Sequence, residues 1–266
     1  MPCSSQLISN GDTLITNNTS VNKIKILYHL GITSENTNFS AEYGDVKFVC
    51  LGGSYTRIRN YAKQFSQLYG YQASNNLCKT DRYEMYKTGP VLWANHGIGG
   101  PSLSIILDEI LQMLLCAGAT NFEMFRLGTS GGIGVQPGTV IVSNGAINTA
   151  LEPYRYQWIG GELVRINFEV KRPAILDQQL CDQLYHIAQQ QKVPVVKGVT
   201  LCADDFYESS ICCVALVNRF EENIIKMSKE FHEEAEMRPF KIISEYIHRK
   251  LNLKNRKEEE ENNITL

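Results

Sequence analysis

The chain has 266 residues, of which 43% are hydrophobic, and a formal net charge of −2. A chain of this size and composition can bury a substantial core, and we expect one domain rather than two. The near-neutral balance and a pI near 6.2 exclude a general attraction to nucleic acid or to an anionic membrane. Any anion must therefore be bound by a local group of residues, and we expect a small ligand.

The composition of the first residues and the spacing of the cysteines bear on the cellular compartment of the protein. Residues 1–22 are rich in Ser, Asn and Thr without periodicity, which predicts a disordered leader and no signal peptide. No stretch approaches the apolar length that a membrane span needs. The eight cysteines form no CxxC pair, and several lie in apolar runs, so we expect reduced core thiols and no metal site. These features predict a cytoplasmic protein.

Strand and helix patterns alternate along the chain. A strand at residues 46–51 leads through a glycine turn into a helix at residues 55–68, and residues 83–96 resemble an antiparallel pair turned at Gly89-Pro90. The next predicted elements are a buried helix at 103–117, strands at 121–127 and 139–146, a helix at 174–191, and strands at 193–201 and 211–217. This alternation favours an α/β fold with a mixed central sheet.

Two features mark the carboxyl-terminal third. Only ADDFYESS separates the strand that ends near Cys202 from the apolar run 211–217, too short for the helical crossover that parallel neighbours require. Either the two strands form a hairpin or a segment has been removed. A basic and then an acidic run at residues 249–262 predicts a solvated helix end, so we expect one domain at residues 23–250 and a charged tail at 251–266.

Two glycine-containing turns each have an arginine nearby. The turn Gly52-Gly53-Ser54 precedes a helix whose first turn includes Arg57, and a helix start of this kind attracts a phosphate. Arg126 ends an apolar strand just before Gly128-Thr129-Ser130, where it needs an anionic partner. Together the arginines predict a forked phosphate clamp. The alternatives are an ordinary turn for the first and an internal ion pair for the second.

Further candidates are weaker when taken alone. Arg82 lies in a polar segment and resembles an ordinary surface arginine, whereas His29 resembles a helix-end or core histidine. His96 begins HGIGGPS and is expected to order that turn. Phe206, within DFYE, is as well suited to a core position as to packing on a base.

Consecutive motifs carry a family resemblance. DVKFVCLGGSYTR, TDRYEMYKTGPVLWANHGIGGPS, RLGTSGGIGVQPGTVIV and TLCADDFYE resemble those of uridine phosphorylases, in the same order over roughly residues 26–208. The RxGTSGG and HGxGxPS pair is typical of nucleoside phosphorylases, and TDRYxMYKxGPV points to the uridine branch. The resemblance implies a three-layer α/β/α fold with a mixed, partly barrelled sheet. It also implies reversible phosphorolysis of uridine to uracil and ribose 1-phosphate in a homodimer, with inorganic phosphate as co-substrate and no cofactor.

The resemblance also implies roles for individual residues. Arg57 and Arg126 resemble the catalytic pair, and the phosphate contacts are Gly53, Arg57, Arg126 and Thr129, of which Thr129 also reaches the ribose. A neighbouring subunit lends Arg82 to the phosphate and His29 to the ribose. Phe206 and Arg219 are the two ends of the base pocket.

The chain departs from the family pattern after Glu208. The Gln-x-Arg loop that holds the base, the helix after it and the Met-Glu strand that grips the ribose have no counterpart, so we expect one helix and one strand to be missing. Three hypotheses remain: an enzyme working with its remaining residues, a non-catalytic phosphate-binding homologue or partner of an intact subunit, and a misassembled product. A purine nucleoside is the alternative substrate class.

Overall fold

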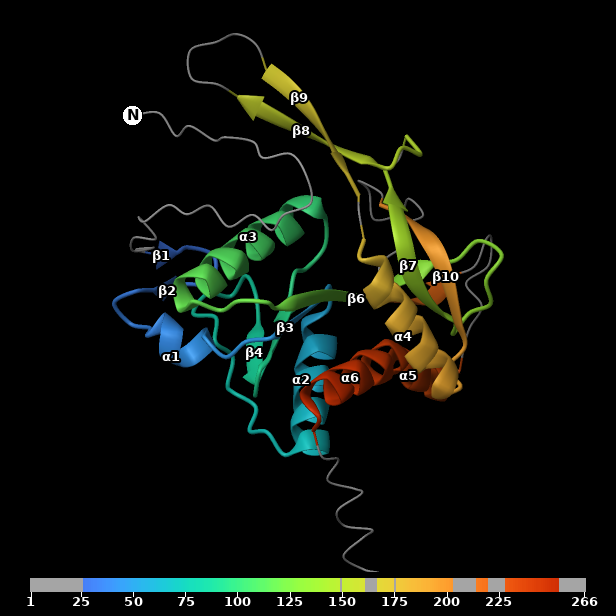
Figure 1. Cartoon of the computed structure of the whole chain (residues 1–266), viewed down its shortest axis with the longest axis horizontal. Coiled ribbons are helices and arrows are strands. Elements are labelled where there is room, and N and C mark those ends of the chain that lie inside the picture. The colour runs from blue at the N-terminus through green and yellow to red at the C-terminus, as the bar shows by residue number, and fades with distance from the viewer. Residues whose placement is uncertain are drawn as a thin grey trace, which may run out of the picture.

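A seven-stranded mixed sheet forms the centre of the molecule (Figure 1). The computed structural model describes residues 26–148, 150–160, 167–174, 176–202, 214–219 and 228–253. The strand order is β10-β7-β11-β6-β3-β5-β4, which leaves β10 and β4 as edges, so the sheet is not a closed barrel. The strands are β3 (Phe48–Gly52), β4 (Met85–Thr88), β5 (Val91–Asn95), β6 (Glu123–Gly131), β7 (Val140–Ile147), β10 (Val195–Leu201) and β11 (Val214–Arg219).

Helices cover both faces of this sheet, which confirms the three-layer α/β/α fold. Helices α2 (Tyr55–Tyr69), α4 (Gln178–Gln190) and α6 (Arg238–Leu251) pack on one face, and α1 (Phe39–Tyr43) and α3 (Gly100–Ala117) on the other. Successive side chains of β3 point to opposite faces of the sheet and join two separate apolar clusters. Phe48 and Cys50 face α2, whereas Val49 and Leu51 face α3. A strand buried on both faces requires a continuous apolar run such as FVCL.

Helix α3 corrects the expectation about membrane spans. It begins at Gly100, three residues earlier than expected. Pro101 lies in its first turn, where backbone amides have no partner within the helix, so the missing N–H of proline costs no hydrogen bond. At 18 residues it is long and apolar enough, by length and composition alone, to cross a bilayer. Its apolar character has a structural cause here, because Ile106, Ile110 and Met113 are buried against the sheet.

Two other element ends differ from the sequence-based prediction. Strand β6 continues through Gly128, Thr129 and Ser130 to Gly131, because β11 pairs with residues 127–131 and supplies hydrogen bonds that the local pattern does not reveal. Helix α4 starts at Gln178 rather than at residue 174. The side chain of Asp177 caps it by accepting a hydrogen bond from the Leu180 amide at 3.0 Å.

The short join after β10 has a topological explanation. Strand β11 lies between β6 and β7, parallel to β6 and antiparallel to β7, whereas β10 is parallel to β7. Strands β10 and β11 therefore run in opposite directions with β7 between them. They are neither a direct hairpin nor parallel neighbours, so the hairpin alternative was wrong, and the crossover that parallel neighbours require does not apply to this pair.

Several elements were not predicted from the sequence. They are the hairpin of β1 (Ile26–Leu27) and β2 (Ile32–Thr33), helix α1, the hairpin of β8 (Tyr154–Gly160) and β9 (Asn167–Pro173), and α5 (Lys229–Glu236). Among the described residues, strands β8 and β9 pair only with each other, and they project from the body in Figure 1. The predicted leader at residues 1–22 and residues 254–266 of the predicted tail lie outside the described residues.

Candidate functional site

Two parallel strands, β3 and β5, end at the same edge of the sheet, beside the parallel strand β6. In the pairing of β3 with β5 and β6, Gly52 is level with Asn95 and with Leu127. The residues that follow, Gly53 and His96, therefore leave the sheet side by side, next to Gly128, where β6 continues along β11. The carboxyl ends of parallel strands are where α/β sheets commonly bind ligands.

Gly53 begins the turn from β3 into α2. A Cβ atom at this position would stand 3.2 Å from the Gly97 carbonyl oxygen, closer than side chains normally pack, so a larger residue would push the two turns apart. The Ser54 side chain caps α2 by accepting from the Arg57 amide at 3.4 Å. The amino-terminal end of this fifteen-residue helix, which carries a partial positive charge, thus lies next to the strand ends.

Arg57 lies half-buried in the first turn of α2. Its Nη1 atom is 3.8 Å from Oε1 of Glu236, the last residue of α5. The carbonyl oxygen of Glu236 also accepts a hydrogen bond from the Tyr61 hydroxyl at 2.7 Å. The end of α5 therefore packs on the start of α2, and the Arg57 guanidinium has a loose acidic neighbour.

Arg126 contacts His96 across the strand ends. The Nε atom of Arg126 donates to Nε2 of His96 at 3.2 Å. His96 is 3% exposed. Burial first, and then the charge of Arg126, lower the pKa of its imidazole to about 4. The ring is thus neutral at physiological pH and accepts through Nε2, so its proton lies on Nδ1, a buried atom without a hydrogen-bond partner among the described residues.

The chemistry of this edge suits an oxyanion. All four residues predicted to contact phosphate lie near the end of β3: Gly53 and Arg57 follow it, and Arg126 and Thr129 lie on the neighbouring strand β6, where Arg126 pairs with Leu51. Thr129 pairs with Leu216 of β11. Two arginines, a helix start and several glycine amides at one edge can bind and orient a phosphate group. The sequence prediction named these four residues but missed the contact of His96 with Arg126.

His29 and Arg82 lie in the α3 layer, across the sheet from α2. His29 is held by Glu109 of α3, whose carboxylate Oε1 is 2.7 Å from the imidazole Nδ1. Arg82 is exposed and donates from Nε to the Tyr83 hydroxyl at 3.1 Å, and that hydroxyl donates to the Ser102 carbonyl of α3 at 2.9 Å. The structure therefore fixes His29 to α3 through Glu109 and connects Arg82 to α3 through Tyr83, and sequence reasoning missed Glu109.

The two residues predicted to contact the base are only partly accounted for. Phe206 lies outside the described residues. Arg219 is the last residue of β11, and its backbone pairs with Gly131 at the end of β6. The Arg219 backbone is thus brought to the edge that carries Arg126 and Thr129.

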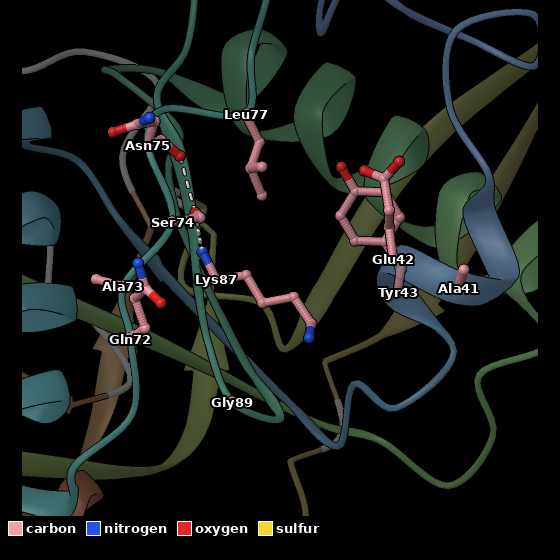
Figure 2. A pocket seen from close by; sticks show the side chains of 10 residues that line it. All are labelled: Ala41, Glu42, Tyr43, Gln72, Ala73, Ser74, Asn75, Leu77, Lys87 and Gly89. Atoms are coloured by element: carbon pink, nitrogen blue, oxygen red, sulfur yellow. Dashed lines mark hydrogen bonds between the residues drawn. The ribbon is translucent and has the colours of Figure 1, made fainter.

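A cavity of about 560 Å³ lies elsewhere on the molecule (Figure 2). It is formed by α1, the segment 72–77 and β4, and Lys87 extends across it. The Lys87 ammonium donates to Asp45 at 3.0 Å. Strands β3 and β5 separate β4 from β6. This cavity is therefore remote from the edge with the two arginines. We place the candidate site at that edge because of its charged residues, although the cavity is elsewhere.

The chain is similar to known phosphorylases. A family model described as the phosphorylase superfamily matches residues 47–238. The uridine and thymidine phosphorylase of Caenorhabditis elegans is 36% identical over 274 aligned residues, covering 85% of this chain and 91% of that protein. Inactive uridine phosphorylase B of Schistosoma mansoni is also 36% identical, over 209 residues, covering 77% of this chain and 66% of that protein.

A solved structure shows the same fold. The crystal structure of Schistosoma mansoni uridine phosphorylase in complex with thymine has a TM-score of 0.75 and 29% identity, and the match covers 86% of this chain and 96% of that one. The nematode alignment also indicates a gap: it runs over 274 positions, whereas 85% of this 266-residue chain is about 226 residues, so about 48 positions lack a counterpart here. The chain belongs to the phosphorylase superfamily and, within it, to the uridine phosphorylases.

Proposed function

We propose that this protein binds phosphate at the carboxyl edge of its sheet and catalyses reversible phosphorolysis of uridine to uracil and ribose 1-phosphate. The observation that carries the proposal is the convergence of Arg57, Arg126 and the start of α2 on one edge, in a chain of the uridine phosphorylase family. Inorganic phosphate is the co-substrate, and the reaction needs no further cofactor.

The chemistry follows from the properties of the edge. A phosphate oxygen attacks the anomeric carbon while the bond from that carbon to the uracil nitrogen breaks, and the electron pair of that bond leaves with the base. The bound anion stabilises the positive charge that develops on the ribose, and the arginines hold it in line for attack. His96 keeps Arg126 oriented without adding a second positive charge, because its imidazole is neutral.

We further propose that turnover is slow. The uracil anion and the ribose hydroxyls need hydrogen-bond partners, and the motifs that supply them in the family have no counterpart after Glu208. Each charge-assisted contact is worth about 1.5–3 kcal/mol, so losing several reduces the rate by orders of magnitude. Overall identity does not decide this, since an inactive relative and an active one are both 36% identical to this chain.

The second candidate is a non-catalytic phosphate-binding homologue that pairs with an intact subunit. The observation that favours it is the contrast between the two arginines and the helix start gathered at the edge and the missing nucleoside motifs. Such a protein can still lend Arg82 and His29 to a neighbour. It would copurify with an intact paralogue and change the activity of the mixed dimer.

The test combines turnover and binding. Purified full-length protein is assayed for phosphorolysis of uridine, thymidine and inosine, next to an intact uridine phosphorylase, and its affinity for phosphate and ribose 1-phosphate is measured by calorimetry. We expect phosphate binding and weak turnover of uridine, with none of inosine. Phosphate binding without any turnover would favour the non-catalytic role, and ordinary turnover would contradict the slow rate. A chain that binds neither phosphate nor ribose 1-phosphate would overturn both candidates.

We also propose a homodimer in which α3 faces the neighbouring subunit. Helix α3 combines a buried face with outward residues that the subunit leaves uncovered, such as Leu115, and Ile98 just before it is exposed as well. His29 and Arg82, which the family resemblance assigns to a neighbour's site, are fixed to this same helix. A dimer of this kind would bury the apolar surface and bring the two lent residues to the partner.

A further inference from the structure

Glu109 is an acidic residue on the inner side of an otherwise apolar helix. It lies in the sequence LSIILDEILQMLL of α3 and is only 9% exposed. Its neighbour Asp108 points outward, where it accepts a hydrogen bond from Gln112 at 2.7 Å. Burying a carboxylate is costly unless hydrogen bonds replace the lost water.

The turn that carries His29 supplies those hydrogen bonds. The His29 amide donates to both carboxylate oxygens of Glu109, at 2.9 and 3.1 Å, and the Leu30 amide donates to Oε2 at 2.9 Å. The His29 imidazole Nδ1 lies 2.7 Å from Oε1. The carboxylate thus binds the backbone and the side chain of one residue at once.

These contacts determine which ring nitrogen carries the proton. Both oxygens of Glu109 already accept from backbone amides, and a carboxylate has no proton to donate. Nδ1 must therefore be the donor, and Nε2 is the nitrogen left for a ligand. The turn itself is also fixed, because the Thr80 hydroxyl donates to the His29 carbonyl and the Gly31 amide donates to the Leu27 carbonyl at 2.8 Å.

We propose that Glu109 is the positioning residue of His29: it holds the imidazole in the Nδ1-protonated form and so presents Nε2 to a ribose hydroxyl in the neighbouring subunit. The inference rests on the proposed function, which assigns His29 to the ribose of a neighbour. A carboxylate that orients a histidine in this way raises the hydrogen-bonding capacity of the opposite nitrogen. Glu109 itself does not touch the substrate.

The tautomer is measured first, because it depends on neither turnover nor ligand. Nitrogen chemical shifts are recorded on protein labelled at its five histidines, and the His29 signals are identified by their loss in His29→Ala. We expect His29 to be protonated at Nδ1 in the unmodified chain and to lose that preference in Glu109→Gln. Protonation mainly at Nε2 in the unmodified chain would overturn the inference whether or not the variant folds.

A double-mutant cycle then measures the effect on the ligand. Calorimetry with ribose 1-phosphate compares Glu109→Gln, His29→Ala and the double variant, with Asp108→Asn as the matched control on the same helix. We expect each single variant to weaken binding about three- to tenfold, and the double variant to be no weaker than His29→Ala. Independent losses that multiply in the double variant would show that Glu109 does not act through His29.

Inorganic phosphate separates this inference from the function on which it rests. All variants should bind phosphate as the unmodified chain does, because Glu109 and His29 are not at the phosphate edge. If the unmodified chain does not bind ribose 1-phosphate, the proposed function fails and the role toward ribose fails with it. If it binds and Glu109→Gln changes neither the tautomer nor the affinity, only the inference is wrong.

Discussion

The carboxyl edge of the sheet and the surroundings of α3 hold their charged groups in different ways. At the edge, Arg126 contacts a buried neutral imidazole and Arg57 has only a loose acidic neighbour, at 3.8 Å. On α3, Glu109 binds His29 through both oxygens, and Arg82 contacts Tyr83. At the edge, the two guanidiniums lie beside a neutral imidazole and a loose carboxylate, whereas around α3 the hydrogen bonds fix the direction of side chains. Affinity and orientation are thus assigned to separate faces of the molecule.

The largest expected effect tests the edge. Arg126→Met removes the guanidinium that contacts His96 and should weaken phosphate binding at least about 100-fold, because two charge-assisted hydrogen bonds are worth about 3 kcal/mol or more. Calorimetry with phosphate measures the change. Arg59→Met is the control, since it removes the same charge from an exposed position on α2 where Arg59 contacts Glu84. Equal losses in both variants would mean that only the net charge matters.

The next effect concerns stability and pH. Because the folded pKa of His96 is about 4 and its ordinary value is 6.5, the unfolded chain binds more protons between these values. His96 therefore contributes stability fully above pH 6.5 and loses it as the pH falls toward 4, by about 3 kcal/mol. Urea unfolding at several pH values measures this. His96→Gln should be less sensitive to acid over that range, whereas exposed His186→Gln should behave like the unmodified chain.

The next prediction tests whether Arg82, which is connected to α3, contributes to the site of a neighbouring subunit. The expected effect is that about a quarter of the sites recover binding. Arg57→Met and Arg82→Met chains are mixed, unfolded and refolded together. If each site combines Arg57 of one subunit with Arg82 of the other, half of the dimers are mixed and each of these has one intact site. About a quarter of the sites should then bind ribose 1-phosphate with the original affinity, although neither variant does so alone. Binding by no site in the mixture would show that Arg82 serves its own subunit.

The smallest change in free energy, at most about 1 kcal/mol, concerns the acidic neighbour of Arg57. Glu236→Gln removes a carboxylate that is partly exposed and 3.8 Å away, and such pairs are worth about 0–1 kcal/mol. Phosphate should bind up to about fivefold more tightly, because Arg57 no longer shares its charge. The control is Glu233→Gln, which lies on the same helix and contacts Lys229 instead. Weaker binding by Glu236→Gln would mean that the carboxylate orients Arg57 rather than competing with phosphate.

Elements determined by local sequence patterns could be predicted from the sequence, whereas contacts between residues distant in the chain could not. The units at residues 46–68 and 83–96 were predicted correctly because apolar periodicity and glycine turns determine them. The end of β6 was misplaced, since its last residues pair with a strand more than 80 positions later. His96 was expected only to order a turn, because its partner Arg126 lies 30 positions later on β6, on the other side of β3. Glu109 could have been noticed as a lone acid on the buried side of an apolar helix, although its partner could not.

The position of β11 has a consequence for how the chain folds. Strands β6 and β7 follow each other in the sequence, yet neither can complete its pairing until residues 214–219 enter between them. During synthesis both strands therefore expose an unpaired edge while the intervening chain is made, and such edges favour aggregation. Contacts so distant in sequence also slow folding. We therefore expect the end of β6, which carries Thr129, to be among the last parts of this molecule to become native, and a chain interrupted before β11 would lack the strand that joins β6 to β7.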